Sequence, residues 1–270
     1  MKAKVLYLFS LIVLTNFSCK FSKNAYEKTT EVLDNVNIFT YQDDIKLGQQ
    51  VKQEIESDPA KFPILDEKSN PQIYSYLREL RDIILNTNQL KYKDKFPWEI
   101  RVIRDDKTLN AFATPGGYIY IYTGLLKFLD SEDELMGVIG HEMAHADLRH
   151  STKQLTKNLG IAILLDAALG DKNSVEQIAA ALIGIQFTRD DESEADNASV
   201  KYLCPTHYNA AGSAGFFKKM LNNPVPPEFL STHPSPKTRV KDIEDLKNKA
   251  ACSGTQTNRE KYEKMKKLLK

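Results

Sequence analysis

The chain has 270 residues, of which 41% are hydrophobic and 27% are charged, so it can bury one substantial core. Its formal net charge is +1 at pH 7, and removing residues 1–18 takes away Lys2 and Lys4 and no acid, which leaves −1. A nearly neutral chain lacks the strongly basic surface that nucleic acids attract, and we therefore expect no nucleic-acid partner.

The N-terminus has the pattern of a bacterial export signal. Two lysines precede an apolar run over residues 5–14, and the small residue Ser18 stands before Cys19, as at the end of a lipoprotein signal peptide. We expect residues 1–18 to be a signal peptide and residues 19–40 to be a tether from a lipidated Cys19, with simple secretion as the alternative. The predicted location is the bacterial cell envelope, on the periplasmic side, as a lipoprotein anchored to the membrane.

Two further cysteines, Cys204 and Cys252, remain in the chain. An even pair is typical of a disulfide in an oxidising compartment, and two unpaired buried thiols are the alternative. A disulfide would agree with export.

Helices and strands are both expected in the first half of the chain. Residues 44–56 carry apolar side chains at helical spacing, and Asn70-Pro71 is typical of the cap and first residue of a second helix. Tyrosine and isoleucine alternate over residues 118–122, which indicates a strand, and residues 98–103 supply a partner strand. One interpretation of strand 118–122 is a half-buried strand whose tyrosines cover the surface.

The most informative segment is a helix that begins near Ser131. Ser131 and Glu134 have the spacing of a capping box. Further along, His141 and His145 lie four residues apart, so one helix face carries both imidazoles, and Glu142 stands beside the first. This pattern suits a zinc site with a carboxylate next to a metal-bound water. A charged helix face that happens to hold two histidines is the alternative.

Two apolar segments follow, residues 159–165 and 178–185. Both are shorter than the about 20 residues needed to cross a bilayer. We interpret them as buried helices or as a flap near a cleft.

A second helix is expected at residues 188–196. Glu192 and Asp196 lie four residues apart on it, so one carboxylate can bind the metal and the other can orient a ligating histidine, whereas Glu194 points away. Five carboxylates in so short a segment ordinarily indicate a solvated surface helix, which is the alternative.

Four motifs, taken together and in order, resemble the HtpX and CAAX-prenyl-protease family of zincin metallopeptidases. The similarity covers roughly residues 40–250 and is greatest to the soluble envelope branch typified by BepA and LoiP. The motifs are Asn110–Gly117, Gly140–His145 with Arg149-His150, Ser193–Asp196, and Thr232–Pro234 with Arg239.

The resemblance implies an α+β, mainly helical fold, a zincin-type domain with a small sheet above an active-site helix. We expect this metallopeptidase domain at residues 41–252 and a charged C-terminal tail at residues 253–270. Zincins commonly bind an extended peptide along an edge strand, and strand 118–122 is the candidate for that edge.

The resemblance also implies roles for five residues. His141, His145 and Glu192 would bind one Zn2+ per chain, and Glu142 would act as the general base. Asp196 would orient a ligand histidine.

Two residues near the end of the domain have roles that remain open. His233 resembles a histidine that can occupy the open position of the metal and keep the enzyme latent, and the alternative is a histidine that fills a turn. Arg239 would face a substrate carbonyl or carboxylate, and the alternative is a surface salt bridge.

The predicted function is a zinc-dependent endopeptidase of the cell envelope that hydrolyses peptide bonds of misfolded or stalled envelope proteins. Its partners would be protein or peptide substrates and, through Cys19, the membrane. The alternative is a chaperone-like outer-membrane assembly factor with a latent zinc site closed by His233.

Overall fold

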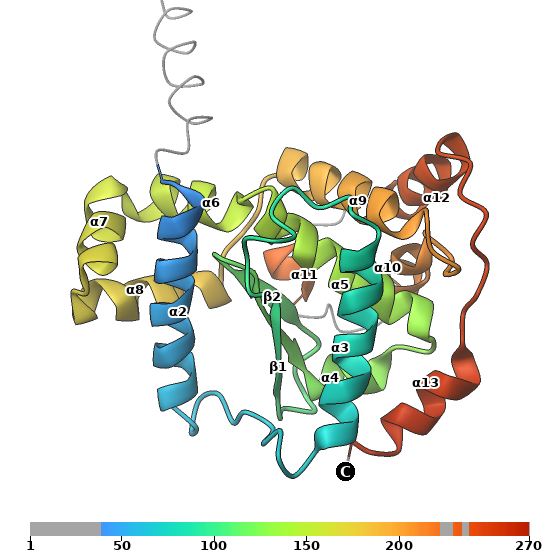
Figure 1. Ribbon diagram of the computed structural model, residues 1–270, viewed down its shortest axis with the longest axis horizontal. Helices are drawn as coiled ribbons and strands as arrows, with labels where there is room; N and C mark the ends of the chain where they lie inside the picture. The colour runs from blue at the N-terminus through green and yellow to red at the C-terminus, as the bar shows by residue number, and fades with distance from the viewer. Residues whose placement is uncertain (1–38, 222–228, 234–237, 270) are drawn as a thin grey trace, which may run out of the picture. The chain divides into compact units, whose positions relative to one another are not determined.

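A three-stranded sheet and the helices packed around it form the described part of the chain (Figure 1). The computed structural model describes residues 39–221, 229–233 and 238–269, and the predicted signal peptide and Cys19 lie outside these ranges. The α+β, mainly helical fold class is confirmed. In chain order the elements are α2 (Tyr41–Ser57), α3 (Pro71–Asn86), β1 (Glu99–Ile103), β2 (Ala111–Thr114), β3 (Tyr118–Tyr122), α4 (Thr123–Phe128), α5 (Glu132–Asp147), α6 (His150–Leu159), α7 (Ile161–Leu169), α8 (Lys172–Ile183), α9 (Arg189–Leu203), α10 (Gly212–Leu221), α11 (Phe229–Thr232), α12 (Arg239–Lys249) and α13 (Arg259–Lys266).

The strand predicted at residues 118–122 is β3, and it lies in the middle of the sheet. The strand order is β1-β3-β2, with β1 parallel and β2 antiparallel to β3. The prediction that this strand is the peptide-binding edge is therefore wrong, and β1 and β2 are the edges among the described strands. The sequence pattern did not reveal β2 because its four residues do not alternate. The chain turns from β2 back into β3 through Gly116 and Gly117, which have φ angles of 78° and 83°.

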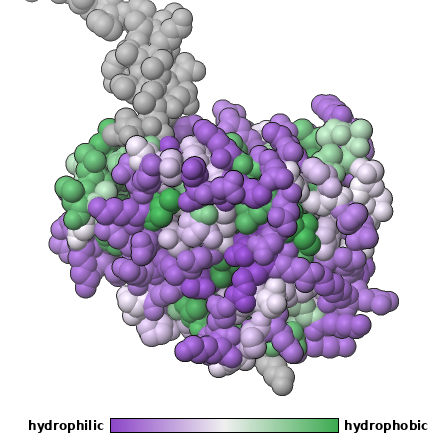
Figure 2. Space-filling view, in the orientation of Figure 1, coloured by the Kyte–Doolittle hydropathy of each residue, from purple (hydrophilic) through white to green (hydrophobic). Residues whose placement is uncertain are grey.

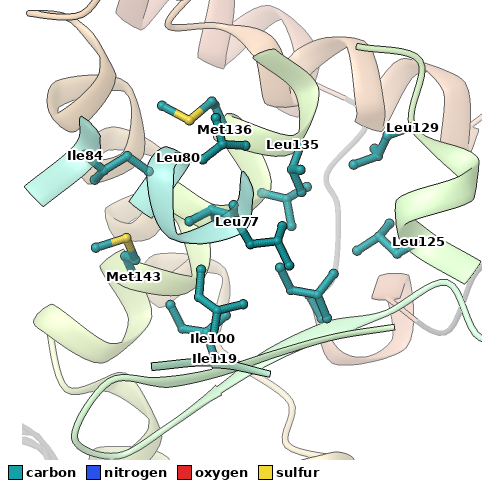
Figure 3. Packing of buried hydrophobic residues seen from close by; sticks show 14 of the residues in the cluster. Leu77, Leu80, Ile84, Ile100, Ile119, Leu125, Leu129, Leu135, Met136 and Met143 are labelled. Atoms are coloured by element: carbon teal, nitrogen blue, oxygen red, sulfur yellow. The ribbon is translucent and has the colours of Figure 1, made fainter. Parts of the chain in front are cut away.

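Helices cover both faces of the sheet. Tyr118, Tyr120 and Tyr122 belong to a hydrophobic cluster with α2 and α8, whereas Ile119 and Ile121 belong to a larger core with α3 and α5. All of β3 is buried, so the interpretation of a half-buried strand is wrong as well. Figure 3 shows the larger core, where leucines of α3 and methionines of α5 meet above isoleucines of the sheet. The sheet and α3 thus fix the position of α5.

Helix α5 is buried on every side, from Glu132 to Asp147. It begins after Ser131 as predicted, but the predicted capping box does not form. Ser131 Oγ donates to Asp133, and the Glu134 carboxylate accepts from the backbone amide of Asp130. The acidic residues at the start of the helix are therefore engaged by other groups.

The carboxylate of Glu132 joins α5 to three other segments. It accepts hydrogen bonds from the hydroxyls of Tyr76 and Tyr208 and from the side chain of Asn258, and it lies 3.2 Å from Lys261 Nζ. Burial alone would raise the pKa of Glu132, but the hydrogen bonds and the lysine outweigh it, so the pKa is lowered. The N-terminus of α5 is thereby attached to α3 and α13.

The charged segment 253–270 includes α13, one side of which packs on the core. Tyr262 and Met265 are buried, and the Tyr262 hydroxyl donates to the backbone oxygen of Leu126 at 2.7 Å. The charged residues of α13 lie on its other side, as the alternation of buried and exposed positions shows.

A disulfide connects Cys204 and Cys252. It joins the C-terminal end of α9 to the segment after α12. The alternative of two unpaired thiols is therefore wrong.

The two apolar segments differ in their burial. The segment 159–165 is interrupted at Gly160, with φ of 83°, between α6 and α7, and the segment 178–185 forms the end of α8. The apolar side of α8 is buried as expected, but α7 leaves three large aliphatic side chains exposed, and there the expectation of a buried helix is wrong. Across the described residues, no helix combines the length and apolar character needed to span a membrane.

Replacing Glu132 by alanine is expected to lower the free energy of unfolding by about 3 kcal/mol, because the buried hydroxyl of Tyr208, the partly buried hydroxyl of Tyr76 and an amide lose their acceptor. Urea denaturation followed by circular dichroism measures this loss. The control Glu263→Ala removes a half-exposed carboxylate of α13 and should change stability by less than about 0.5 kcal/mol. Equal losses in the two variants would contradict the role given to Glu132.

Candidate metal centre and active site

Two imidazoles and a carboxylate converge between α5 and α9, which pack against each other (Figure 1). His141 Nε2 and His145 Nε2 are 3.0 Å apart, and Glu192 lies 3.4 Å from each, with Oε2 toward His141 and Oε1 toward His145. All three side chains are buried. The structure therefore brings together the three residues that the sequence suggested as metal ligands.

The start of α9 determines which of its carboxylates face α5. Thr188 caps the helix and forms a capping box with Asp191, and Gln154 of α6 donates to the same aspartate at 2.6 Å. From this start, Glu192 and Asp196 face inward and are buried, whereas Glu194 is exposed. The interpretation of a solvated surface helix therefore holds only for the outer side of α9.

A third imidazole lies in the same cluster. His233 follows α11, and its Nδ1 is 2.9 Å from Glu192 Oε1 and 3.4 Å from His141 Nε2. Its ring stacks on Phe229 with a centroid distance of 4.2 Å. One ligand atom from each of His141, His145, Glu192 and His233 can be chosen so that all four lie within 4.8 Å of one another.

Asp196 and Arg239 contact the side chains of this cluster and hold them in place. Asp196 Oδ1 is 3.1 Å from His141 Nδ1, and Arg239 donates to both oxygens of Asp196 at 2.6 and 2.8 Å. Arg239 Nη1 also lies 2.8 Å from Glu192 Oε2. Arg239 is only 2% exposed, so its ion pairs are interior contacts and not a surface salt bridge.

Glu142 is the one carboxylate of the site with no hydrogen bond among the described residues. It is fully buried, and neither of its oxygens accepts a hydrogen bond there. His233 Nε2 lies 3.6 Å from Glu142 Oε1. Burial raises the pKa of Glu142 above that of an ordinary glutamate.

The two histidines of α5 are held in different protonation states. Burial alone would lower the pKa of His141, but Asp196 and Glu192 outweigh it and raise this pKa to about 9. Burial lowers the pKa of His145 well below its usual value, so this ring is neutral. Burial would raise the pKa of Glu192, but the neighbouring histidines outweigh it, and the carboxylate remains ionised.

His150 is a residue of the site to which sequence reasoning gave no role. Its Nδ1 lies 3.0 Å from His145 Nδ1, and its Nε2 lies 3.3 Å from Glu194 Oε2. His150 follows His145 by five residues, which is not the spacing of one helix face. It reaches His145 because Arg149, at φ 61°, ends α5 and starts α6 in a new direction. The motif Arg149-His150 was the available signal, but its meaning depended on this turn.

The donor set fits a transition metal such as zinc. Zinc–nitrogen bonds of about 2.0–2.1 Å in a tetrahedral site put neighbouring ligand atoms about 3.3 Å apart. Five contacts among His141, His145, Glu192 and His233 measure 2.9 to 3.4 Å, with both oxygens of Glu192 taking part, and single ligand atoms of the four residues lie within 4.8 Å. Imidazole nitrogens with a single carboxylate suit zinc better than calcium or magnesium, which prefer oxygen.

A small mixed sheet on a buried helix, with two imidazoles of that helix meeting a carboxylate from a second helix, defines a metallopeptidase of the zincin type. Residues 70–247 match the family model described as Peptidase family M48, and the protein belongs to this family. The family prediction is thereby confirmed. Membership of this peptidase family implies a divalent metal, and the donor side chains described above are grouped so that they could hold one.

Individual relatives agree with this assignment. The chain is 35% identical over 150 residues to the mitochondrial metalloendopeptidase OMA1 of Arabidopsis thaliana, covering 53% of this chain and 30% of the relative. It is 29% identical over 194 residues to a putative beta-barrel assembly-enhancing protease of Vibrio cholerae, covering 64% and 39%. With the beta-barrel assembly-enhancing protease of Escherichia coli K12 it is 27% identical over 213 residues, covering 72% and 43%. The chain thus spans less than half the length of these relatives.

Replacing Arg239 by alanine is expected to destabilise the metal-free protein by about 3–5 kcal/mol, because two buried carboxylates lose their cation. Chemical denaturation in the presence of a chelator measures the change. Lys241→Ala, which removes a largely exposed lysine two residues away, is the control and should leave the stability nearly unchanged. A small loss for Arg239→Ala would mean that the carboxylates do not depend on it.

Proposed function

We propose that this protein is a zinc-dependent endopeptidase in which His141, His145 and Glu192 hold one Zn2+ and Glu142 is the general base. The observation that carries the proposal is the convergence of three buried donor side chains beside a buried carboxylate that has no hydrogen bond within the described chain. A buried glutamate without a partner costs stability and has no evident structural purpose. A proton-transfer role in a metal site accounts for it.

Glu142 would move protons in both halves of the reaction. Bound zinc would supply a Lewis acid that polarises water and the peptide carbonyl. Glu142 would take a proton from the attacking water and give it to the leaving amine. Its raised pKa brings it closer to the range in which a group both accepts and releases a proton.

Neighbouring side chains would position the ligands. Asp196, held by Arg239, would accept a hydrogen bond from the Nδ1 of His141 and leave Nε2 for the metal. His150 would accept from Nδ1 of His145 in the same way, and its own Nε2 would donate to Glu194. Each histidine would thus be fixed in the tautomer that metal binding requires.

The substrate class follows from the relatives and the predicted location. Two of the relatives named above are assigned to enhancing the assembly of β-barrels. Together with the export signal and the disulfide, this supports an envelope lipoprotein, anchored at Cys19, that cleaves misfolded or stalled envelope proteins.

An extended peptide would bind along β2 and not along β3. The strand β2 is an edge of the sheet and packs on α5, the helix that carries Glu142. The backbone oxygen of Leu109, just before β2, accepts from the amide of Phe229 at 3.2 Å. The segment that ends in His233 therefore starts beside this edge, where it would limit access.

A latent state is the second part of the proposal. His141, Glu142, His145, Glu192 and His233 are each at most 1% exposed, so a peptide has no access to them in this conformation. His233 would occupy the fourth position of the metal and would have to move before cleavage. A chaperone-like assembly factor with a permanently closed site is the competing function, and the same burial favours it.

The variant Glu142→Gln tests the catalytic role. Casein cleavage should fall by about 10²–10⁴-fold because the amide cannot accept the proton, while zinc content, measured by elemental analysis, should stay at one per chain. The control Glu176→Gln changes an exposed glutamate of α8 and should cleave at the original rate. Unchanged cleavage by Glu142→Gln would refute the assignment. An assembly factor would keep its cellular role in this variant.

The variant His233→Ala tests latency. If nine-tenths of the molecules are closed, removing the ring should raise the rate of peptide cleavage about tenfold. His207→Ala, which removes an exposed histidine, is the matched control. A rate that is unchanged or lower after His233→Ala would exclude a blocking role.

Zinc binding should release protons in a pH-dependent manner. His141 keeps a proton below a pKa of about 9 in the metal-free protein, and zinc must displace it. Calorimetry at pH 7.5 in two buffers of different ionisation enthalpy should therefore show release of about one proton, and zinc affinity should rise with pH up to about 9. Identical heats in the two buffers would contradict the assignment of His141.

A further inference from the structure

Helix α7 exposes a row of large aliphatic side chains. Ile161, Leu165 and Leu169 are 43%, 48% and 84% exposed, and their spacing of four residues places them along one side of the helix. We call these three residues the apolar ridge. The described chain has only three other large hydrophobic residues that are comparably exposed, and these lie apart from one another in sequence, at Leu148, Leu221 and Leu268. Figure 2 shows the green surface over α7 at the left of the molecule, beside largely purple surroundings.

The other side of α7 is firmly packed. Leu164 and Ala167 are buried in the hydrophobic cluster shared with α2 and α8. The exposure of the apolar ridge is therefore not a consequence of a loosely attached helix. Exposed aliphatic area in a row is unfavourable in water, and such a row is typical of a surface that another apolar phase covers.

The position of the apolar ridge in the fold favours the lipid bilayer as the apolar phase that covers it. The first described residue, Phe39, is buried in the same cluster as Leu164, and its backbone oxygen accepts a hydrogen bond from Arg149. The chain before Phe39 contains the predicted lipid attachment at Cys19. The twenty residues from Cys19 to Phe39 can span at most about 70 Å in any conformation. A lipidated chain would therefore keep α7 within reach of the bilayer at all times.

The charges at the ends of α7 agree with a lipid surface. Lys157 precedes the helix and Lys172 follows it, and both are exposed; at the second end Asp171 is also exposed, and Glu176 lies 3.8 Å from Lys172 Nζ. Lysines that flank an aliphatic row suit anionic headgroups. Asp166, which borders the ridge on the helical wheel, limits how deeply the helix can enter.

We propose that the apolar ridge of α7 inserts into the surface of the lipid bilayer to which the chain is anchored. The ridge would be a second attachment, in addition to the acyl chains at Cys19. The acyl chains would already hold the chain at the membrane, and a second attachment would fix the orientation of the domain on it. The inference uses the lipid anchor of the proposed function but is independent of catalysis.

Fluorescence quenching by brominated lipids tests this contact. The full chain, produced with its own N-terminus and carrying Glu142→Gln to prevent self-cleavage, is reconstituted with vesicles of phosphatidylethanolamine and phosphatidylglycerol. Its one tryptophan, Trp98, is 1% exposed and gives a constant background. Leu165→Trp and Leu169→Trp place a reporter on the ridge, and Leu268→Trp places one on a leucine of α13 with 38% exposure as the matched control.

We expect bromine on the acyl chains to quench the reporters at positions 165 and 169 at least twofold and to leave the one at position 268 unchanged. Equal quenching at all three positions, or none at 165 and 169, would overturn the proposal. A blue shift at 165 that grows with protein concentration without lipid would instead identify a second copy as the occupant. A blue shift without lipid that is independent of concentration would identify the chain before Phe39. Since no variant relies on cleavage, a failure here is distinct from a failure of the peptidase.

Discussion

The structure of this protein depends on a buried cluster of charges between α5 and α9. Glu192 and Asp196 can be placed in the interior only because His141 and Arg239 supply opposing charge, and neither group would be tolerated alone. The surrounding helices and the sheet hold these four charged side chains together. The sheet and α3 hold α5 from one side, α9 is started by a capping box, and Arg239 at the beginning of α12 closes the cluster.

In this member of the M48 peptidase family, the same cluster is closed to solvent. The imidazole of His233 adds a third nitrogen donor beside the carboxylate of Glu192, and its Nε2 lies 3.6 Å from Glu142 Oε1. Donors of this kind attract a metal, while the burial of each one excludes a peptide. Membership of the M48 family supports the proposed peptidase chemistry, and the proposed latency of the site depends on the arrangement around His233.

Periodic patterns in the sequence predicted the elements that are long or strictly alternating. The helix of His141 and His145 and the strand of Tyr118 to Tyr122 lie where they were expected, because repeated spacing is a local property. The position of β3 within the sheet could not be predicted, since it depends on β2, whose four residues carry no periodic signal. The contact of His150 with His145 depends on the backbone turn at Arg149. The exposure of one side of α7 depends on which other elements pack against this helix. Such features arise from tertiary packing.

The disulfide has a consequence for the movement of His233. Cys204 and Cys252 are 48 residues apart, and the ring of chain that they close contains both His233 and Arg239. Any excursion of His233 away from His141, His145 and Glu192 takes place within this covalent ring. The blocking group would therefore remain tethered close to the place it left, and return to the resting state would require no search through the surrounding solution.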